Sequence, residues 1–572
     1  MLLLRQANPS WSARMLRDIL RETGKPINDT TGTKLVFPRL DVLSALKLDW
    51  PTESHDFQRT GFTVLQGDIK NANNVSRTDF VLRENITEEQ VVRPSVGEVA
   101  TRGEPIELVI SAVHDKQGAA NDTTLYGVRT ENLATRLLWK RVLKGGAVMS
   151  PPTIADVDGD GEKEAVAGVR NGTIYVIESL DGTTAALKWN LSLPKKNVSS
   201  IGFPVMDFGG GVAVADIDQN GRREIIFADH MQNIPDWPAE LYVVEYTGSS
   251  GSLKYSLTYS NVTNGTGGAF APVSVADIDD DPQLEIIVPS YYGVHVIDYN
   301  ASANALQLRC STNHGRIDGS AVIFDIDRDN EYELIYSTST YMCAGGKTCK
   351  NATYIVNART CAVERQINYT VVTRVTPSVA NLDGDANLEI VVSTGNGTGN
   401  LGAIVCYDAS TGNENCRFDN SGSFRPGFVS PSIADIDGDG QYDIITAENN
   451  GSQVHIINPV TNTSWNYTFS GVIDSAIAIA DVDNDGDFRA EIAVKRAGSP
   501  ITLLAVRGSS NRPPILSAIR NITALAGSIV DLNASGEVLA TDPSGDSVTI
   551  SFSGPFNSSG HWQTNASDID SN

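Results

Sequence analysis

Seven acidic segments between Asp156 and Glu491 carry the residues in this sequence that could do chemistry. Each copy approaches the pattern D-x-D-x-D-G-x-x-E and is flanked by apolar runs. The best two read DVDGDGEKE from residue 156 and DIDGDGQYD from residue 435. Other copies are looser, because Pro282 and Ala386 stand where glycine is expected and the last copy reaches its final acid two residues late. The repeat indicates one chemical device used seven times.

The spacing of these acids suits a divalent cation. Calcium takes about six to eight oxygen ligands, which alternate residues of a tight loop supply while glycine permits the turn. An EF-hand places its last acid later, between helices, so this motif is a different one. Solvated Asx-type turns are the alternative, but carboxylates packed this closely repel one another without a cation. We predict several Ca²⁺ ions, up to about seven. The candidate ligands are Asp156, Asp158, Asp160, Glu164, Asp216, Asp218, Asn220, Glu224, Asp277, Asp279, Asp281, Glu285, Asp325, Asp327, Asp329, Glu333, Asn381, Asp383, Asp385, Glu389, Asp435, Asp437, Asp439, Asp443, Asp481, Asp483, Asp485 and Glu491.

The period of the repeat predicts the fold. The first residues of the copies fall at 156, 216, 277, 325, 381, 435 and 481, a spacing that suits one four-stranded blade per repeat. Continuous apolar runs such as residues 285–288 are typical of strands buried on both faces. The expected architecture is a β-propeller.

Residues 136–510 resemble the FG-GAP/VCBS, integrin-α-like calcium propellers. The resemblance implies seven blades, with a calcium site between the first two strands of each. The last blade has no room for a fourth strand before Pro513. We therefore predict that residues 137–140 (LLWK) close the ring by joining it.

The beginning of the chain has a different character. Residues 13–23 form an amphipathic stretch with Ser12 as a plausible N-cap and Gly24 as a stop, which predicts a helix. Together with residues 2–12 and 37–46, this stretch resembles the C-terminal end of a subtilisin-like (S8) serine protease domain, although a generic helical hairpin is the alternative. The resemblance implies a nucleophile upstream of Met1, so the catalytic triad is absent from this chain and enzymatic activity is left open.

The predicted fold class is therefore mainly β: a seven-bladed propeller with a short α-helical N-terminal segment and a partial C-terminal β-sandwich. Residues 1–48 are assigned to the protease tail and residues 49–135 to a β-rich connector. The propeller follows at 136–510. Residues 511–572 resemble the opening strands of a cadherin- or Ig-like domain, too short for a complete one.

The composition of the chain limits the classes of partner that it can bind and indicates where the protein is located. The formal charge of −25 argues against nucleic acid and anionic membranes; seven divalent ions would add 14 charges and leave −11. No segment is long and apolar enough for a membrane span. N-x-S/T sequons hold 20 of the 41 asparagines, which indicates a secreted or cell-surface glycoprotein, although no signal sequence is present in this chain.

All six cysteines fall between Cys310 and Cys416. This clustering predicts local disulfides: Cys343 with Cys349, Cys406 with Cys416 across a hairpin, and Cys310 with Cys361 by elimination. Free buried thiols are the alternative.

Three functions are compatible with these features. The main interpretation is the C-terminal part of a secreted subtilisin-like protease, with the propeller as a binding or anchoring module for an extracellular protein or polysaccharide. The first alternative is a non-enzymatic adhesin or cell-surface calcium-binding protein. The second is a propeller-type polysaccharide lyase.

Overall fold

The chain divides into two compact units. The larger one comprises Met1–Asp483 with Arg489–Ala505, and the smaller one Asn484–Phe488 with Val506–Asn572. The computed structural model describes residues 25–28, 36–39, 62–70, 75–79, 95–97, 99, 107–113, 122–131, 134–146, 148, 150–160, 162–179, 185–194, 196–197, 204–205, 211–229, 239–260, 268–269, 271–279, 281, 283–340, 349–385, 387–395, 402–419, 429–448, 451–469, 473, 477–482, 489–495, 501–505, 515–516, 529–531, 540–541 and 561–563.

Within these ranges every regular element is a strand, so the mainly β class is confirmed. The helix expected over residues 13–23 lies outside them. The nearest described elements are β1 (Lys25–Asn28) and β2 (Val36–Arg39), which pair antiparallel.

Four-stranded sheets dominate the larger unit, and in most of them four strands consecutive in sequence pair side by side. The first three are β5 (Ser95–Gly97), β6 (Glu107–Val113), β7 (Thr123–Glu131), β8 (Ala134–Leu143); β9 (Thr153–Ala155), β10 (Glu164–Val169), β11 (Thr173–Ser179), β12 (Ala185–Ser192); and β15 (Ala213–Ala215), β16 (Glu224–Ala228), β17 (Ala239–Tyr246), β18 (Gly251–Ser260). The next three are β19 (Ser274–Ala276), β20 (Glu285–Pro289), β21 (Val294–Asn300), β22 (Ala305–Ser311); β23 (Val322–Phe324), β24 (Glu333–Thr338), β25 (Ala352–Asn357), β26 (Val363–Asn368); and β27 (Ser378–Ala380), β28 (Glu389–Thr394), β29 (Ala403–Asp408), β30 (Glu414–Phe418).

The remaining two sheets recruit strands from the beginning of the chain. β3 (Phe62–Gln66) pairs in parallel with the first strand of β31 (Ser432–Asp435), β32 (Asp443–Ala447), β33 (Gln453–Asn458) and β34 (Thr463–Thr468). β4 (Ser76–Asp79) is the fourth strand beside β35 (Ala478–Ala480), β36 (Glu491–Lys495) and β37 (Ile501–Ala505). A short pair, β13 (Lys196–Asn197) with β14 (Pro204–Val205), lies between two of the larger sheets in sequence.

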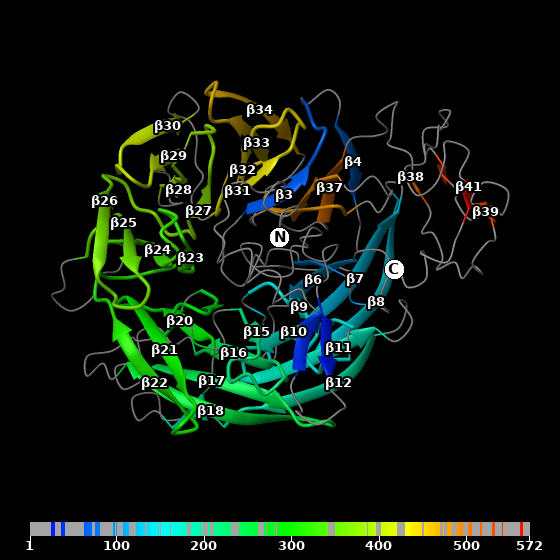
Figure 1. Ribbon diagram of the computed structural model, residues 1–572, viewed down its shortest axis with the longest axis vertical. Coiled ribbons are helices and arrows are strands. Elements are labelled where there is room, and N and C mark those ends of the chain that lie inside the picture. Colours follow the sequence, from blue (N-terminus) through cyan, green and yellow to red (C-terminus); the bar gives the residue numbers. More distant parts are fainter. Residues whose placement is uncertain are drawn as a thin grey trace. The chain divides into compact units, whose positions relative to one another are not determined.

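The first strands of successive sheets contact one another. β5 touches β9, β9 touches β15, β15 touches β19, β19 touches β23, β27 touches β31, β31 touches β35, and β35 returns to β5. The sheets of the larger unit therefore follow one another around a common centre, with their first strands innermost (Figure 1).

Two expectations about this ring are corrected. Residues 137–140 do not close the last sheet, because β8 pairs with β7 over its whole length. The closing strand is β4, which also comes from before the first acidic segment. Seven blades are not confirmed either, since the described residues contain seven four-stranded sheets and one five-stranded sheet, eight in all. The sheet β5–β8 has no acidic repeat to reveal it, and the expected boundary at residue 136 cuts through it.

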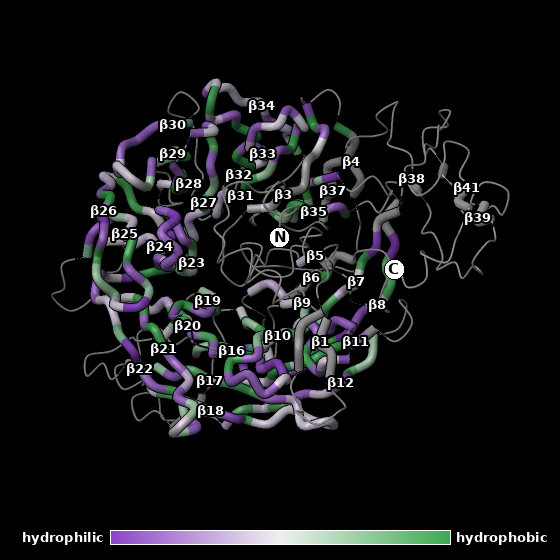
Figure 2. The backbone as a smooth tube through the Cα atoms, viewed as in Figure 1, coloured by the Kyte–Doolittle hydropathy of each residue, from purple (hydrophilic) through white to green (hydrophobic). Residues whose placement is uncertain are grey.

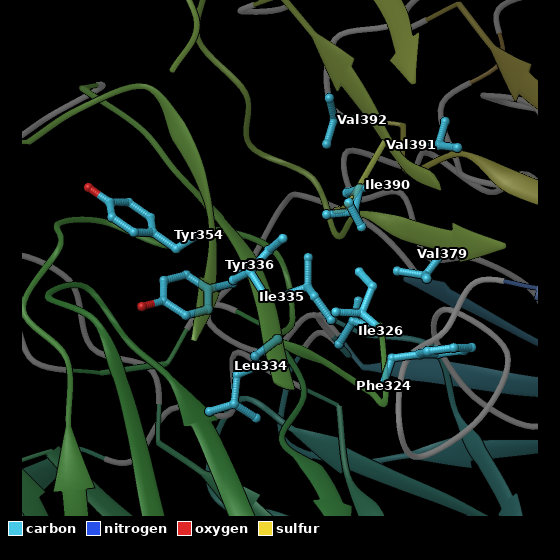
Figure 3. Close-up of a cluster of buried hydrophobic side chains, with 14 of the residues drawn as sticks. Phe324, Ile326, Leu334, Ile335, Tyr336, Tyr354, Val379, Ile390, Val391 and Val392 are labelled. Atoms are coloured by element: carbon cyan, nitrogen blue, oxygen red, sulfur yellow. The ribbon is translucent and has the colours of Figure 1, made fainter. Parts of the chain in front are cut away.

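Burial follows the position of a strand in its sheet. The second strands β24 and β28 are buried at every residue, whereas the fourth strands β26 and β30 are largely exposed. Figure 2 shows the corresponding concentration of hydrophilic residues on these outer strands. Neighbouring sheets pack through their inner strands, as Figure 3 shows for Ile335 of one sheet and Val379 and Ile390 of the next. Burial of this apolar surface is the main stabilising term.

Disulfide bonds cross-link the middle of the ring. Cys310 of β22 bonds to Cys361, which joins two successive sheets, and Cys406 bonds to Cys416 between β29 and β30. Both pairs confirm the sequence prediction. The third expected pair involves Cys343, which lies outside the described residues.

The smaller unit is described only through two short antiparallel pairs. β38 (Ile515–Leu516) pairs with β40 (Ala540–Thr541), and β39 (Ile529–Asp531) pairs with β41 (His561–Gln563). The partial sandwich there stays a prediction.

Candidate metal loops and an arginine cluster

The acidic segments connect the first strand of a sheet to its second, and we call each an acidic loop, named by its first residue. Each ends on the acid that begins the second strand, such as Glu164 of β10 or Asp443 of β32. One oxygen of this terminal acid accepts a hydrogen bond from the backbone N–H that follows the first loop residue. The bond recurs in all seven loops at 2.7 to 3.3 Å: Val157 to Glu164, Ile217 to Glu224, Ile278 to Glu285, Ile326 to Glu333, Leu382 to Glu389, Ile436 to Asp443 and Val482 to Glu491.

The terminal acids are buried, which sets the electrostatics of each loop. Burial, together with the charge of nearby acids, raises the pKa of Glu285 and of Glu333 to about 9. Burial and neighbouring aspartates likewise raise the pKa of Asp443 to about 8. Buried carboxyls crowded by other carboxyls ionise fully only when a cation joins them. The loops are therefore sites at which positive charge is stabilised.

The structure brings most of the predicted ligands together. Among the described residues, at least five loops have three acids with oxygens within 4.8 Å of one another: Asp156, Asp158 and Glu164; Asp216, Asp218 and Glu224; Asp277, Asp279 and Glu285; Asp325, Asp327 and Asp329; Asp383, Asp385 and Glu389. Such a donor set fits a hard divalent cation.

The third acid or amide of the motif, which is the fifth residue of the loop, mainly shapes the turn. Asp160, Asn220, Asp281, Asp385 and Asp439 each accept a hydrogen bond from the backbone two residues later. Asn381 does the same for Gly384, three residues on. Asp483 and Asp485 of the last loop lie outside the described residues.

Basic side chains enter three of the loops, a feature that sequence reasoning missed. Lys188 Nζ lies 2.6 Å from Asp158 and 2.8 Å from Glu164, and Lys254 Nζ lies 2.6 Å from Asp218 and 2.9 Å from Glu224. Arg309 pairs with Asp279 of its loop and, at 2.7 Å, with Asp298. All three residues belong to fourth strands, β12, β18 and β22.

A β-bulge places each of these cations. Strand pairing skips a residue of the fourth strand in six sheets, and we call this residue the bulge residue; β18 skips a second residue, Tyr259, near its end. The bulge residues are Leu138, Lys188, Lys254, Arg309, Glu364 and Asn415. The sheet β31–β34 pairs without such a shift. The bulge re-aims one side chain per strand, and a basic residue in each of three equivalent outer strands was the only signal in the sequence.

A second charged cluster lies at the other edge of the sheets, in the connections that precede first strands. Asp318 accepts from Arg316 Nε at 2.6 Å, and its second oxygen accepts from Arg374 Nε. Arg316 is buried, with its guanidinium carbon 5.0 Å from the ring centre of Tyr291. Arg374 is partly exposed. Counted over Arg316, Asp318 and Arg374, this arginine cluster carries one net positive charge in a strongly acidic chain.

Close backbone approach builds the cluster. A Cβ at Gly319 would overlap the backbone of Val375 and Thr376, so only glycine lets the connections before β23 and β27 touch. Ser320 N–H then donates to Thr376 Oγ1 at 2.9 Å. These residues lie more than fifty positions apart in sequence, and no motif marks them.

An aromatic group borders the same connection. His314 stacks on Tyr354 with ring centres 4.0 Å apart, and its Nδ1 lies 2.7 Å from Tyr336 Oη. Burial lowers the pKa of His314, and the charge of Lys350 lowers it further. The imidazole is therefore neutral at pH 7 and able to accept a proton.

Comparison with known proteins identifies the fold. No protein-family model and no curated protein matches the chain. Among solved structures, it is similar to a europium-containing methanol dehydrogenase (TM-score 0.54, 10% identity, 78% of this chain and 89% of that one). It is also similar to an exotype rhamnogalacturonan lyase (0.52, 13%, 76% of each) and to a quinohemoprotein alcohol dehydrogenase from Comamonas testosteroni (0.52, 10%, 83% of each). These likenesses show a propeller-like all-β fold.

The comparisons correct the functional interpretation. The three structures named above are propeller enzymes that match three quarters or more of this chain, and none of the three is a subtilisin. The interpretation as the C-terminal part of a subtilisin-like protease is therefore wrong. Membership of the FG-GAP/VCBS family is not confirmed, since no family model matches. In the part of the chain that the structure describes, no helix is long and apolar enough to cross a membrane.

Proposed function

We propose that the protein is an extracellular, calcium-braced propeller of the polysaccharide-lyase type, which binds an acidic polysaccharide at the arginine cluster. The observation that carries the proposal is the bridge of Asp318 between Arg316 and Arg374. It holds two guanidinium groups in fixed positions beside the first strands of two adjacent sheets.

Arginine pairs suit the carboxylates of uronic acids. A guanidinium is planar and always charged, and it matches a carboxylate through two parallel hydrogen bonds. Asp318 offsets one of the two charges, so the cluster attracts an anion without being a large basic patch. The acidity of the rest of the chain repels polyanions elsewhere and favours binding at this single place.

Lyase chemistry would use the same arrangement. A base removes the proton on the carbon next to the uronate carboxylate, the bond to the glycosidic oxygen breaks, a carbon–carbon double bond forms, and the departing oxygen takes up a proton. Arg374, the partly exposed member of the cluster, would stabilise the negative charge that develops on the carboxylate, while the buried Arg316 would hold Asp318 in place. His314 is the candidate base, because it lies two residues before Arg316 and its lowered pKa keeps it neutral.

The likeness to a rhamnogalacturonan lyase supports this choice only through the fold, because identity is 13%. It agrees with the second alternative drawn from the sequence. The sequons, which predict a secreted or cell-surface protein, agree with an extracellular polymer as substrate.

Calcium would brace the scaffold. In the Asp325 and Asn381 loops, the grouped acids supply oxygen ligands for such an ion. An ion there would fix the turn between two strands and stabilise the folded form by mass action. Extracellular sites of this kind bind with dissociation constants on the order of 0.1 to 1 mM.

The test pairs Arg374→Gln with Arg417→Gln, an equal charge change on the outer strand β30, where Arg417 pairs with Glu414. Each protein is mixed with polygalacturonate and with a neutral glucan, and binding and the ultraviolet absorbance of unsaturated uronate are followed. Wild type and Arg417→Gln should bind and cleave polygalacturonate, whereas Arg374→Gln should lose at least tenfold in both. Binding without product would reduce the protein to a binding module, and absence of binding in wild type would overturn the proposal.

A further inference from the structure

The bulge residue varies with the loop it accompanies. In the sheet β5–β8, which has no acidic repeat, it is Leu138, whereas the next three sheets carry Lys188, Lys254 and Arg309. The following two sheets carry Glu364 and Asn415. One structural position therefore holds an apolar, a cationic, an acidic or an amide side chain according to the sheet.

The cationic versions occupy the centre of their loops. Lys188 Nζ lies within 3.2 Å of one oxygen from each of Asp158, Asp160 and Glu164, at 12% side-chain exposure. Lys254 Nζ repeats this geometry at 14% exposure. An ammonium that contacts two or three converging carboxylates takes the place that a divalent ion would need.

The acidic and amide bulge residues do not neutralise the negative charge of their acidic loops, and the acidic one adds to it. Glu364 lies close enough to Asp327 and Asp329 that burial and both acids raise its pKa. Asn415 donates from its side-chain nitrogen to Glu389 at 3.3 Å and adds no charge.

We propose that Lys188, Lys254 and Arg309 are tethered cations that replace the divalent ion in the Asp156, Asp216 and Asp277 loops. Bound metal is then confined to the Asp325, Asn381, Asp435 and Asp481 loops. Because three of the seven loops are occupied by a side-chain cation, the protein binds four ions at most. This inference rests on the calcium part of the proposed function. An ammonium and a divalent ion sharing the same oxygens repel strongly at such short range, and for this reason each loop holds one or the other.

The arrangement has a functional consequence. One arc of the ring, formed by the sheets from β9 to β22, contains the tethered cations and stays folded without calcium. The other arc, formed by the sheets from β23 to β37, depends on bound calcium. The arginine cluster precedes β23 and β27, whose loops belong to the calcium-dependent arc, so binding of the acidic polymer should follow calcium concentration.

The test counts metal ions. Lys188→Met and Lys254→Met keep the apolar stem and remove the charge, while Lys144→Met is the matched control, because Lys144 is exposed and pairs with Asp122 away from any acidic loop. After dialysis against calcium, elemental analysis and terbium luminescence give the number of bound ions, and calorimetry gives the calcium-dependent shift in Tm. We expect four ions or fewer in wild type and in Lys144→Met, and one more in each loop variant, with a larger Tm shift.

Each outcome separates the two ideas. About seven ions in wild type, or no gain in either lysine variant, would overturn the tethered-cation inference and leave calcium binding intact. No ion in wild type but one in Lys188→Met would support the inference and remove calcium from the proposed function. If one variant fails to fold by circular dichroism, the other decides.

Discussion

The side-chain hydroxyl of Ser378 donates a hydrogen bond to the backbone carbonyl of Pro431, 2.7 Å away on the neighbouring sheet. Ser378 is the first residue of β27, and the same bond recurs at the first residue of four other first strands: Ser95 to Pro152, Thr153 to Val212, Ser274 to Ala321 and Ser432 to Ile477. All five hydroxyls are buried. The bonds join consecutive sheets near the centre of the ring.

Ser378→Ala should lower the free energy of unfolding by about 1 to 2 kcal/mol, because it leaves the buried carbonyl of Pro431 without this donor. Urea unfolding monitored by fluorescence would measure the change. Ser464→Ala on the exposed outer strand β34 is the control and should stay within about 0.5 kcal/mol of wild type. Equal effects of the two substitutions would show that the inter-sheet bond contributes nothing.

Calcium dependence should differ between loops. Asp327→Asn removes a candidate ligand from a loop whose bulge residue is the acidic Glu364, so the calcium-induced rise in Tm should shrink. Asp158→Asn acts on a loop neutralised by Lys188, and the rise should stay as in wild type, although the protein is less stable throughout. Melts with excess calcium and with chelator make the comparison. The ranking fails if Asp158→Asn reduces the shift as much as Asp327→Asn.

Features that rest on a local pattern were predictable from the sequence. The acidic loops, the strands on either side of them and the Cys406–Cys416 pair all lie within short stretches of chain. The terminal acids could be placed because they begin the second strands that the apolar runs mark. The number of sheets could not be obtained this way, since the sheet β5–β8 has no acidic repeat.

Features that depend on register or on distant pairing were not predictable. Lys188 enters its loop only because a bulge shifts the pairing of β12 by one residue. The closing strand β4 is a polar tetrapeptide, Ser76–Asp79, with no hydrophobic signature. The arginine cluster joins two connections through Gly319, whose role appears only when the backbones meet.

His295 provides a prediction about pH. Its ring is buried, with Ser290 Oγ 3.0 Å from Nε2, Ser311 Oγ 2.9 Å from Nδ1 and Tyr259 beside it, and burial lowers the pKa from 6.5 to about 4. Below pH 6.5 the unfolded chain gains a proton that the folded protein does not, so stability falls as pH drops towards 4. The loss attributable to this group is about 2 kcal/mol at pH 5.

Urea unfolding of wild type and His295→Gln at pH 7.5 and pH 5 would isolate this term. The variant should lose less stability between the two pH values, since glutamine does not titrate. Because other groups titrate equally in both proteins, only the difference between the slopes matters. Parallel slopes would mean that His295 takes up its proton as readily in the folded protein as in the unfolded chain.

Gly67 tests how the beginning of the chain is fastened to the ring. The N–H of Gly67 donates to the carbonyl of Asp435 at 2.7 Å, and the N–H of Ile69 donates to the carbonyl of Ile436 at 2.8 Å, which extends the contact of β3 with β31. A Cβ at Gly67 would overlap the carbonyl oxygen of Ile436. Gly67→Ala should therefore push this segment away and cost about 1 to 3 kcal/mol.

The matched control is Lys70→Ala in the same segment, because Lys70 is exposed and its removal should change stability by less than about 0.5 kcal/mol. Thermal melts would rank the two, and limited proteolysis would show whether cleavage before residue 80 becomes faster. Faster cleavage in Gly67→Ala alone would establish that β3 holds β4 in place as the closing strand, since the two strands are consecutive in the chain. Unchanged stability and cleavage would mean that β4 closes the last sheet without help from β3.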